Sequence, residues 1–352
     1  MLQPLMGLLK NRIVWGVAAV AALGGGGWAG TQYMGWNPLA SASTETAAAN
    51  EEGAESPGTE TQTPLPGTTP VANRPPRLLM VGSFNIQRFG ETKASKPEVM
   101  AHLETIALPF DVLAIQEVQS KDKKVIKDFI EALNQKHQAH FNYVTSPFLG
   151  SNDYKESYAF IYDTSRVSLV ETPFYIADPE DKMMREPLVA RFQVRNEDPQ
   201  KGFSFALVNV HTRPKGDGAP AEVDFLSDVV NYLQEVFADE EDDILLLGDF
   251  NLSWDEIRTD TKFKDRSDWE GIISGDVTTN ILQTASYDNI LYRPNSTREY
   301  QGRSGVINLM EKLRISVETA GDISDHMPIW AAFSLEESPT AIASTTDETQ
   351  VR

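Results

Sequence analysis

The sequence predicts an α+β or α/β fold in which two packed β-sheets lie between layers of helices. Short apolar runs of strand length alternate with segments of helical periodicity, and several of the runs are apolar on both faces. Such runs are typical of strands covered on each side, and their alternation with helices is typical of layered folds. A chain of 352 residues that is 41% hydrophobic and 23% charged can bury the core that this fold needs.

Eight apolar runs have the length and composition of strands. They cover residues 78–84, 112–116, 142–145, 158–162, 203–210, 244–247, 289–292 and 329–333. Three amphipathic helices are expected between them. One covers about 97–108 with Ser95 as its N-cap, another covers about 123–134, and the third places Leu226, Val229, Val230, Leu233, Val236 and Phe237 on one face.

The first 37 residues are expected to lie outside the fold. Lys10 and Arg12 precede an uncharged stretch, residues 13–30, which is typical of a secretory signal or an uncleaved membrane anchor. Its length favours the anchor, with Lys10 and Arg12 on the inner side and the rest of the chain extracytoplasmic, anchored or secreted. An exported chain without cysteine suggests a bacterial source.

Low-complexity sequence flanks the predicted domain on both sides. Residues 38–77 are rich in Thr, Ala, Glu, Pro, Ser and Gly and predict a flexible linker, because such a segment cannot bury enough apolar surface to order itself. Residues 336–352 predict a disordered tail. The catalytic domain is therefore expected to span residues 78–335.

Charge and cysteine content exclude several classes of function. The net charge of −20 excludes a protein that coats nucleic acid by bulk positive charge. The absence of cysteine excludes disulfides, thiolate catalysis, Cys-ligated zinc and iron–sulfur clusters. The remaining chemistry must use carboxylates, amides, hydroxyls and the five histidines.

Polar side chains follow the predicted strands repeatedly. Alone, each is an ordinary turn former, but together they supply the oxygen ligands and imidazoles that a Mg²⁺-assisted phosphate site needs. They are Asn85 in SFNIQRFG, Glu117 in LAIQEVQ, His211 in LVNVHTRP, Asp249 and Asn251 in LLLGDFNLSW, and Asp325 and His326 in ISDHMPIW.

These motifs, in this order, resemble the endonuclease/exonuclease/phosphatase superfamily. The segments GSNDYKESYAFIY and REPLVARF, with their YKE and REP triplets, bring the resemblance closest to the deoxyribonuclease I branch. It covers nearly all of residues 78–335. It implies an α+β fold, a four-layer αββα sandwich with two packed mixed β-sheets, and metal-dependent hydrolysis of phosphodiesters.

The resemblance also implies roles for individual residues. Catalysis would use two histidines, each oriented by a carboxylate, and a pair that orients water and binds the phosphate: Glu156 with His211, Asp288 with His326, and Asp249 with Asn251. The metal would be Mg²⁺, with Mn²⁺ as an alternative. Its main ligand would be Glu117, assisted by Asn85 and Asp325.

Substrate contacts are implied at three positions. Tyr154 would pack in the DNA minor groove and Arg185 would contact a phosphate. Gln87 and Gln119 stand where that branch carries arginines, and Arg88 is placed to compensate. A loop at 274–284, with Asp276, Thr278 and Thr279, resembles a stretch that holds structural Ca²⁺.

The expected function is a Mg²⁺-dependent endonuclease that hydrolyses DNA with little sequence preference. Its partners would be DNA as substrate and a membrane through the N-terminal segment, with no obligate protein partner. Two alternatives remain open: a phosphodiesterase or phosphatase acting on lipid head groups or other phosphoesters, and a non-catalytic tethered binding module.

Overall fold

The structure, a computed structural model, describes residues 39–41, 75, 77–150, 155–238 and 240–338. The predicted anchor, most of the predicted linker and all but the start of the predicted tail lie outside these residues. Strand β1 (Leu39–Ser41) falls inside the segment predicted to be a flexible linker, and it pairs antiparallel with β7 (Phe174–Ile176). In the described part of the chain no helix is long and apolar enough to cross a membrane.

Two β-sheets form the centre of the fold. The first has eight strands in the order β1-β7-β8-β9-β10-β12-β11, with β6 also paired to β8. Its further strands are β6 (Val167–Leu169), β8 (Leu188–Val194), β9 (Ser204–His211), β10 (Ile244–Asp249), β11 (Glu270–Gly271) and β12 (Asp288–Tyr292). The β9–β10 pair is parallel and its other pairs are antiparallel.

The second sheet has six strands in the order β13-β14-β2-β3-β5-β4. They are β2 (Leu79–Gly90), β3 (Val112–Gln119), β4 (Phe141–Thr145), β5 (Ser157–Asp163), β13 (Tyr300–Val306) and β14 (Ile329–Phe333). Only β2 and β3 pair in parallel among its described strands. Both sheets are therefore mixed, as predicted.

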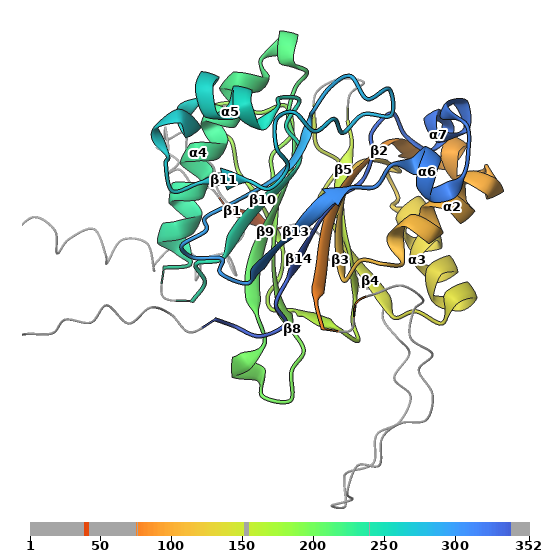
Figure 1. Cartoon of the computed structure of the whole chain (residues 1–352), viewed down its shortest axis with the longest axis horizontal. Coiled ribbons are helices and arrows are strands. Elements are labelled where there is room, and N and C mark those ends of the chain that lie inside the picture. The colour runs from red at the N-terminus through yellow and green to blue at the C-terminus, as the bar shows by residue number, and fades with distance from the viewer. Residues whose placement is uncertain (1–38, 42–74, 76, 151–154, 239, 339–352) are drawn as a thin grey trace, which may run out of the picture. The chain divides into compact units, whose positions relative to one another are not determined.

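Helices cover the outer face of each sheet, which confirms the four-layer sandwich (Figure 1). The eight-stranded sheet packs against α4 (Ala219–Val236) and α5 (Trp254–Asp260). The six-stranded sheet is covered by α1 (Glu91–Ala94), α2 (Pro97–Ala107), α3 (Lys124–His137), α6 (Leu309–Leu313) and α7 (Val317–Ile323). Three 3₁₀ turns, η1 (Pro199–Lys201), η2 (Lys215–Asp217) and η3 (Lys262–Asp265), lie between these elements.

Aromatic side chains fill the space between the two sheets. Phe203 stacks on Phe205 at 4.9 Å between ring centroids and on Phe333 of the opposite sheet at 5.9 Å. Phe160 and Phe192, also from opposite sheets, meet edge to face at 5.7 Å. Burial of such large side chains is the main favourable contribution to folding. This packing holds the two sheets, and therefore the strand ends, in a fixed relation.

All eight predicted strands are present, but the predicted cap of α2 is wrong. Ser95 does not cap the helix: the N-cap is Lys96, which makes no side-chain cap bond, and Pro97 occupies the first turn. Because proline lacks an N–H and has a helical φ, the helix can start there without a capping hydroxyl. The helices α5, α6 and α7 were not predicted as elements, nor were the strands β6, β7, β8, β11 and β13.

Strand register brings three predicted site residues to one edge of the eight-stranded sheet. Asp249, at the end of β10, lies opposite His211 at the end of the parallel strand β9. On its other side Asp249 lies opposite Asp288, the first residue of antiparallel β12. The chain direction of these three strands therefore gathers an imidazole and two carboxylates at the same level of the sheet.

Candidate active site

The first histidine is held by a buried carboxylate. His211 Nδ1 lies 2.7 Å from Glu156 Oε1, and Glu156, just before β5, is only 2% exposed. Arg185 Nε lies 3.1 Å from Glu156 Oε2, and its Nη1 donates to the His211 carbonyl at 3.3 Å. The His211 amide donates to the hydroxyl of Tyr158 at 3.0 Å. Ring, backbone and carboxylate partner are all fixed, so Nε2 is the atom presented to the site.

The second histidine has a parallel arrangement. His326 Nδ1 lies 2.8 Å from Asp288 Oδ2. The same Asp288 oxygen accepts a hydrogen bond of 2.7 Å from the hydroxyl of Thr279, which in turn accepts the amides of Tyr287 and Asp288. The Thr279 hydroxyl is thus fully engaged and buried. This hydroxyl therefore orients Asp288, and Ca²⁺ binding by the 274–284 loop stays a prediction.

Asp249 lies between the two imidazoles. Its Oδ2 is 3.5 Å from Nε2 of His211 and 3.5 Å from Nε2 of His326. The same oxygen accepts a 3.0 Å hydrogen bond from Asn85 Nδ2, while Oδ1 accepts the Asn251 amide at 2.9 Å. Two histidines, one at the end of β9 and one in the segment before β14, therefore face one shared carboxylate.

The Gly-Asp-Phe-Asn segment needs its glycine to make this geometry. Gly248 has φ 147°, and a Cβ there would lie 1.9 Å from the carbonyl oxygen of Val210 on the neighbouring strand. Asn251 has a left-handed φ of 50°, and its Nδ2 donates to the Thr212 carbonyl at 3.0 Å. The turn after β10 thus places the Asn251 amide group beside Asp249.

The charges of the paired groups support one another. Burial opposes the charged form of each, but His211 and Arg185 lower the pKa of Glu156, and Glu156 and Asp249 raise the pKa of His211. Likewise burial lowers the pKa of His326, yet Asp288 and Asp249 outweigh it and raise that pKa to about 10. Each carboxylate therefore stabilises the imidazolium form of its histidine.

Backbone irregularities aim the candidate metal ligands. Glu117 has φ 63°, rare for a residue with a side chain, and the register of β3 shifts against β5 at this point. Its Oε2 accepts the Arg88 amide at 2.8 Å, and Arg88 has φ 51° at the matching irregularity of β2. Local backbone strain of this kind is typical of functional sites.

The residues predicted to bind Mg²⁺ fit a hard cation. Asn85 Oδ1 is buried and has no hydrogen-bond partner among the described residues, so this oxygen is free to coordinate a metal ion. Glu117 and Asp325 add carboxylates, and both raise the pKa of Lys93, whose own burial nonetheless lowers it to about 8. Asp325 is exposed and accepts from Gln87 Nε2 at 2.9 Å. An amide oxygen and two carboxylates form a donor set suited to Mg²⁺.

A second group could also hold a metal. Ligand atoms of Asp249, Asp288 and His326 lie within 4.8 Å of one another, whereas no such group of His, Asp and Glu in the described chain includes Glu117 or Asp325. The His326 Nδ1 and Asp288 Oδ2 atoms of this group are already bonded to each other. A cation at this group would therefore compete with the hydrogen bond that orients His326.

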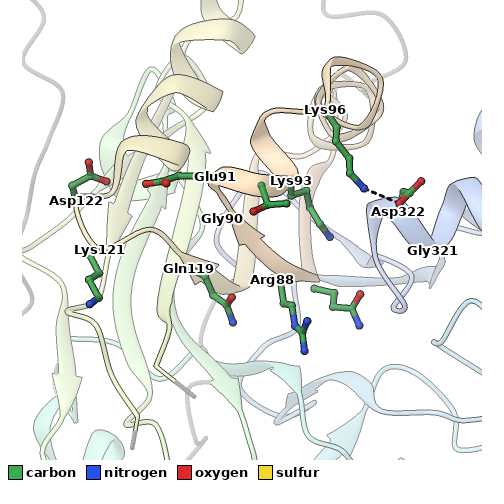
Figure 2. A pocket seen from close by; sticks show the side chains of 12 residues that line it. Arg88, Gly90, Glu91, Lys93, Lys96, Gln119, Lys121, Asp122, Gly321 and Asp322 are labelled. Carbon is green, nitrogen blue, oxygen red and sulfur yellow. Dashed lines mark hydrogen bonds and ion pairs between the residues drawn. The ribbon is translucent and has the colours of Figure 1, made fainter. Parts of the chain in front are cut away.

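A groove runs beside the site along the ends of β2 and β3. Its volume is about 740 Å³, and its lining includes Gln87, Arg88, Lys93, Gln119 and Lys121. Figure 2 shows Arg88, Gln119 and Lys121 projecting to the same side of the strand ends, with Lys96 turned away toward Asp322. The Lys93 ammonium donates to the carbonyl of Ile323. Four cationic side chains line this groove, together with three acidic ones, Glu91, Asp122 and Asp322.

The substrate-binding predictions have different outcomes. Arg88 is exposed and lines the groove. Arg185 is only 6% exposed and is bound to Glu156 and to the His211 carbonyl, so its contact with a phosphate remains a prediction. Tyr154 lies outside the described residues.

Several supporting residues were not found by sequence reasoning. Between the sheets, Gln116 Nε2 donates to Asn209 Oδ1 at 2.6 Å and to Ser83 Oγ at 3.0 Å, while Asn209 Nδ2 donates to backbone carbonyls of β3 and β5. Ser324 Oγ donates to the Asn85 carbonyl at 2.6 Å. Buried polar residues inside predicted strands, such as Asn209 in LVNVH, were the available signal.

Comparisons with known proteins identify the family to which this fold belongs. A profile of the Endonuclease/Exonuclease/phosphatase family matches residues 82–326. Deoxyribonuclease-1 of Homo sapiens is 33% identical over 71% of this chain and 90% of its own length, and deoxyribonuclease-1 of Gallus gallus is 32% identical over the same shares. The fold is similar to that of an endonuclease/exonuclease/phosphatase family protein from Bacteroides thetaiotaomicron, with a TM-score of 0.53 and 19% identity over 75% of this chain and 98% of that one.

Proposed function

The chain belongs to the endonuclease/exonuclease/phosphatase family and is a phosphodiester hydrolase, and from this premise we propose that it is a Mg²⁺-dependent endonuclease that cuts DNA with little sequence preference. One observation carries the proposal. Two buried histidine–carboxylate pairs, His211 with Glu156 and His326 with Asp288, present their Nε2 atoms to the single carboxylate of Asp249. Hydrolysis needs one proton acceptor and one proton donor in a fixed relation, and this arrangement provides both.

The proton transfers are divided between the two pairs. One imidazole accepts a proton from the attacking water, and the other donates a proton to the oxygen that leaves. Glu156 and Asp288 fix the tautomers by holding Nδ1 and stabilise the positive ring in either role. Asp249 and Asn251 lie where they can orient the water and the phosphate. In each pair a buried carboxylate holds the imidazole Nδ1, so we assign the catalytic role to both.

The metal would be bound by Glu117, with Asn85 and Asp325. A bound Mg²⁺ would polarise the phosphoryl oxygens and offset the charge that develops on the phosphate. The chain's own contribution is to orient these ligands. The Arg88 amide holds Glu117, and the Ser324 hydroxyl holds the Asn85 backbone.

Two features support DNA as the substrate. Curated relatives that cover most of the chain are deoxyribonuclease-1 proteins. The groove beside the site presents the exposed side chains of Arg88 and Lys121, which can bind phosphates of any sequence. Gln87 and Gln119 can donate hydrogen bonds to phosphate but release no counterions. We therefore expect contacts to the backbone and little discrimination among bases.

The test is conversion of supercoiled plasmid to nicked circle by the full chain, with Mg²⁺, with Mg²⁺ plus Ca²⁺, and with chelator. His211→Ala is expected to lower the rate by about 10²-fold to 10⁴-fold, the range for a lost general acid or base. Glu117→Gln is expected to raise the Mg²⁺ concentration needed for half-maximal rate. His137→Ala is the matched control. His137 also contacts a carboxylate, Glu104 at 3.0 Å, but it lies at the end of α3 and not among the proposed catalytic residues.

A substrate panel separates DNA from other phosphoesters. Duplex DNA, sphingomyelin and a phosphoinositide are compared with wild type and His211→Ala. Metal-dependent nicking that disappears in His211→Ala supports the nuclease. Turnover of a lipid without nicking would refute the DNA assignment while keeping the hydrolase, and metal binding without turnover of any substrate would refute the enzyme.

We also propose that the domain acts outside the cytoplasm, tethered by its N-terminal segment. The support is the charge pattern of Lys10 and Arg12 before the uncharged residues 13–30. Fractionation of expressing cells, followed by protease treatment of intact spheroplasts, tests it. A domain that stays protected from protease, or that is found in the soluble cytoplasmic fraction, would contradict the proposal.

A further inference from the structure

Three acidic side chains converge at the end of the sheets opposite the active site. Asp243 precedes β10, Glu299 precedes β13, and Glu337 follows β14. A carboxylate oxygen of each lies within 4.8 Å of those of the other two. Asp243 and Asp249 are six residues apart at the two ends of β10, which is about 20 Å at the usual rise of a strand. The acidic cluster Asp243–Glu299–Glu337 is therefore separate from the catalytic residues.

Two of the three carboxylates are buried, and each has one oxygen without a hydrogen-bond partner. Asp243 is 2% exposed and Glu299 is 1% exposed, and Asp243 Oδ1 and Glu299 Oε2 have no hydrogen-bond partner among the described residues. Burial raises the pKa of Asp243 to about 8, and the neighbouring hydroxyl of Thr297, itself buried, acts in the opposite direction. The other oxygens are used: Glu299 Oε1 accepts the Ser338 amide at 2.6 Å, and Glu337 Oε2 accepts the Ser204 amide at 3.1 Å. Backbone amides thus hold Glu299 and Glu337, while Asp243 Oδ1 and Glu299 Oε2 stay without a hydrogen-bond partner.

No cationic side chain neutralises the cluster. Among the described residues no lysine or arginine forms an ion pair with Asp243, Glu299 or Glu337. A fourth carboxylate, Glu241, adds to the charge, since its Oε1 accepts the Asp243 amide at 3.0 Å. The nearby Arg191 pairs instead with Glu171 and Glu240. Buried carboxylates without a counter-charge are costly, and convergent free oxygens are what a bound cation would satisfy.

We propose that Asp243, Glu299, Glu337 and the Thr297 hydroxyl bind a structural Ca²⁺. Ca²⁺ accepts six to eight oxygen ligands in flexible geometry, so carboxylates from three separate segments with additional backbone or water oxygens suit it. Asp243 flanks β10 of the eight-stranded sheet, while Glu299 and Glu337 flank strands of the six-stranded sheet. The ion therefore cross-links the two sheets at the end remote from the catalytic residues, and its role is stability.

The test is thermal unfolding of the full chain, first freed of metal by chelator and then titrated with CaCl₂. Ca²⁺ at about a hundred times its dissociation constant is expected to raise the unfolding midpoint by about 5 to 10 °C. The same shift is expected in Glu117→Gln, which lacks the main active-site ligand. Asp243→Asn and Glu299→Gln are expected to lose the shift, and their metal-free midpoints should equal or exceed that of wild type because repulsion is removed.

Two further variants keep the test decisive. Glu337→Gln, at the more exposed member of the cluster, is expected to weaken Ca²⁺ binding in isothermal calorimetry even if Asp243→Asn does not fold. Asp276→Asn, in the separate loop at 274–284, should retain the shift. Wild type that shows no shift with 10 mM CaCl₂, or a shift that survives in Asp243→Asn and Glu337→Gln but disappears in Asp276→Asn or Glu117→Gln, would overturn the proposal.

Discussion

Thr279 connects a loop to the second catalytic pair, because its hydroxyl donates to Asp288 and accepts two backbone amides. Thr279→Val keeps the shape of the side chain but leaves two buried N–H groups unpaired and Asp288 less firmly held. We expect a loss of about 1–3 kcal/mol in unfolding free energy. We also expect kcat to fall about 10-fold to 100-fold, the range typical of removing a partner that orients a functional imidazole.

The measurement is kcat and KM for plasmid nicking, together with urea unfolding. Thr278→Val is the control, because Thr278 is the next residue in the same loop and is only half-buried. If the loss in Thr279→Val were reversed by excess Ca²⁺, a calcium-ligand role would replace the orienting role.

Gly248 is the residue on which the Asp249 turn depends. Replacing it with alanine would place Cβ 1.9 Å from the Val210 carbonyl oxygen at a φ of 147°. We expect Gly248→Ala to destabilise the protein by at least about 1–3 kcal/mol and to lower activity, because either the turn or β9 must shift. Gly216→Ala is the control, since a Cβ there meets nothing within 4 Å. Equal unfolding midpoints for the two variants would contradict this account.

Tyr292, at the end of β12, gives a prediction for alkaline pH. Burial, with Glu270, raises the pKa of its phenol to about 12. A pKa raised in the folded state means that the neutral form is favoured by folding. Its contribution is complete below the unfolded pKa near 10 and is lost as pH rises through about 12, at about 1.4 kcal/mol for each pKa unit.

Tyr292→Phe removes this ionisation. We expect its alkaline unfolding midpoint to move to higher pH than that of wild type, as followed by circular dichroism. Absorbance at 295 nm should show one fewer tyrosine titrating in the high-pH step. A Tyr292→Phe variant that unfolds at the same pH as wild type would show that this phenol does not limit alkaline stability.

At the scale of elements, strands were predictable where apolar runs were continuous. β10 (Ile244–Asp249) is buried throughout, and its run ILLL identifies it from sequence. β13 (Tyr300–Val306) was not predicted, because it is an edge strand with the polar, glycine-containing sequence YQGRSGV and no apolar face. Helices α5 to α7 are five to seven residues long, too short for a helical period to be visible.

The candidate site was predictable for a different reason. His211 and Asp249 follow apolar runs and could be found as polar residues at strand ends. Asp288 begins its strand and was implied only by the family resemblance; register places the three residues side by side. Partners that depend on distant packing could not be found in this way. The contact of Tyr158 with the His211 amide, and that of Gln116 with Asn209, join residues 53 and 93 positions apart.

Helix α5 starts directly after the Asp249 turn with a complete capping box. Ser253 Oγ accepts the Glu256 amide and Glu256 Oε2 accepts the Ser253 amide. We expect Ser253→Ala to cost about 1 kcal/mol of unfolding free energy. Ser95→Ala should cost less, because Ser95 does not cap α2 and bonds only to the Thr92 carbonyl on the surface. Chemical denaturation of both variants gives the comparison, and an equal loss would restore Ser95 as a cap.

At the scale of the whole molecule, the sign of the charge opposes the proposed substrate. A protein of net charge −20 repels DNA at a distance, so binding must depend on the few cations of the groove and on the divalent metal. Lys96 is already paired with Asp322 at 2.8 Å, and the buried Lys93 ammonium donates to the Ile323 carbonyl, which leaves Arg88 and Lys121 as the main phosphate contacts. Because these contacts are few, the affinity for DNA should depend only moderately on salt.

Added salt is therefore expected to act in opposite directions on stability and on activity. Between about 0.05 and 0.3 M KCl, screening of self-repulsion should raise the unfolding midpoint. Over the same range kcat/KM for DNA should fall with a logarithmic slope of about −2 to −4, a value set by the few phosphate contacts. Arg88→Gln and Lys121→Gln should each make that slope shallower by about 1. Lys136→Gln is the control, because Lys136 lies on α3 and pairs with Glu104, and it should leave the slope unchanged. A slope that is the same in all three variants would mean that the strand binds elsewhere on the protein.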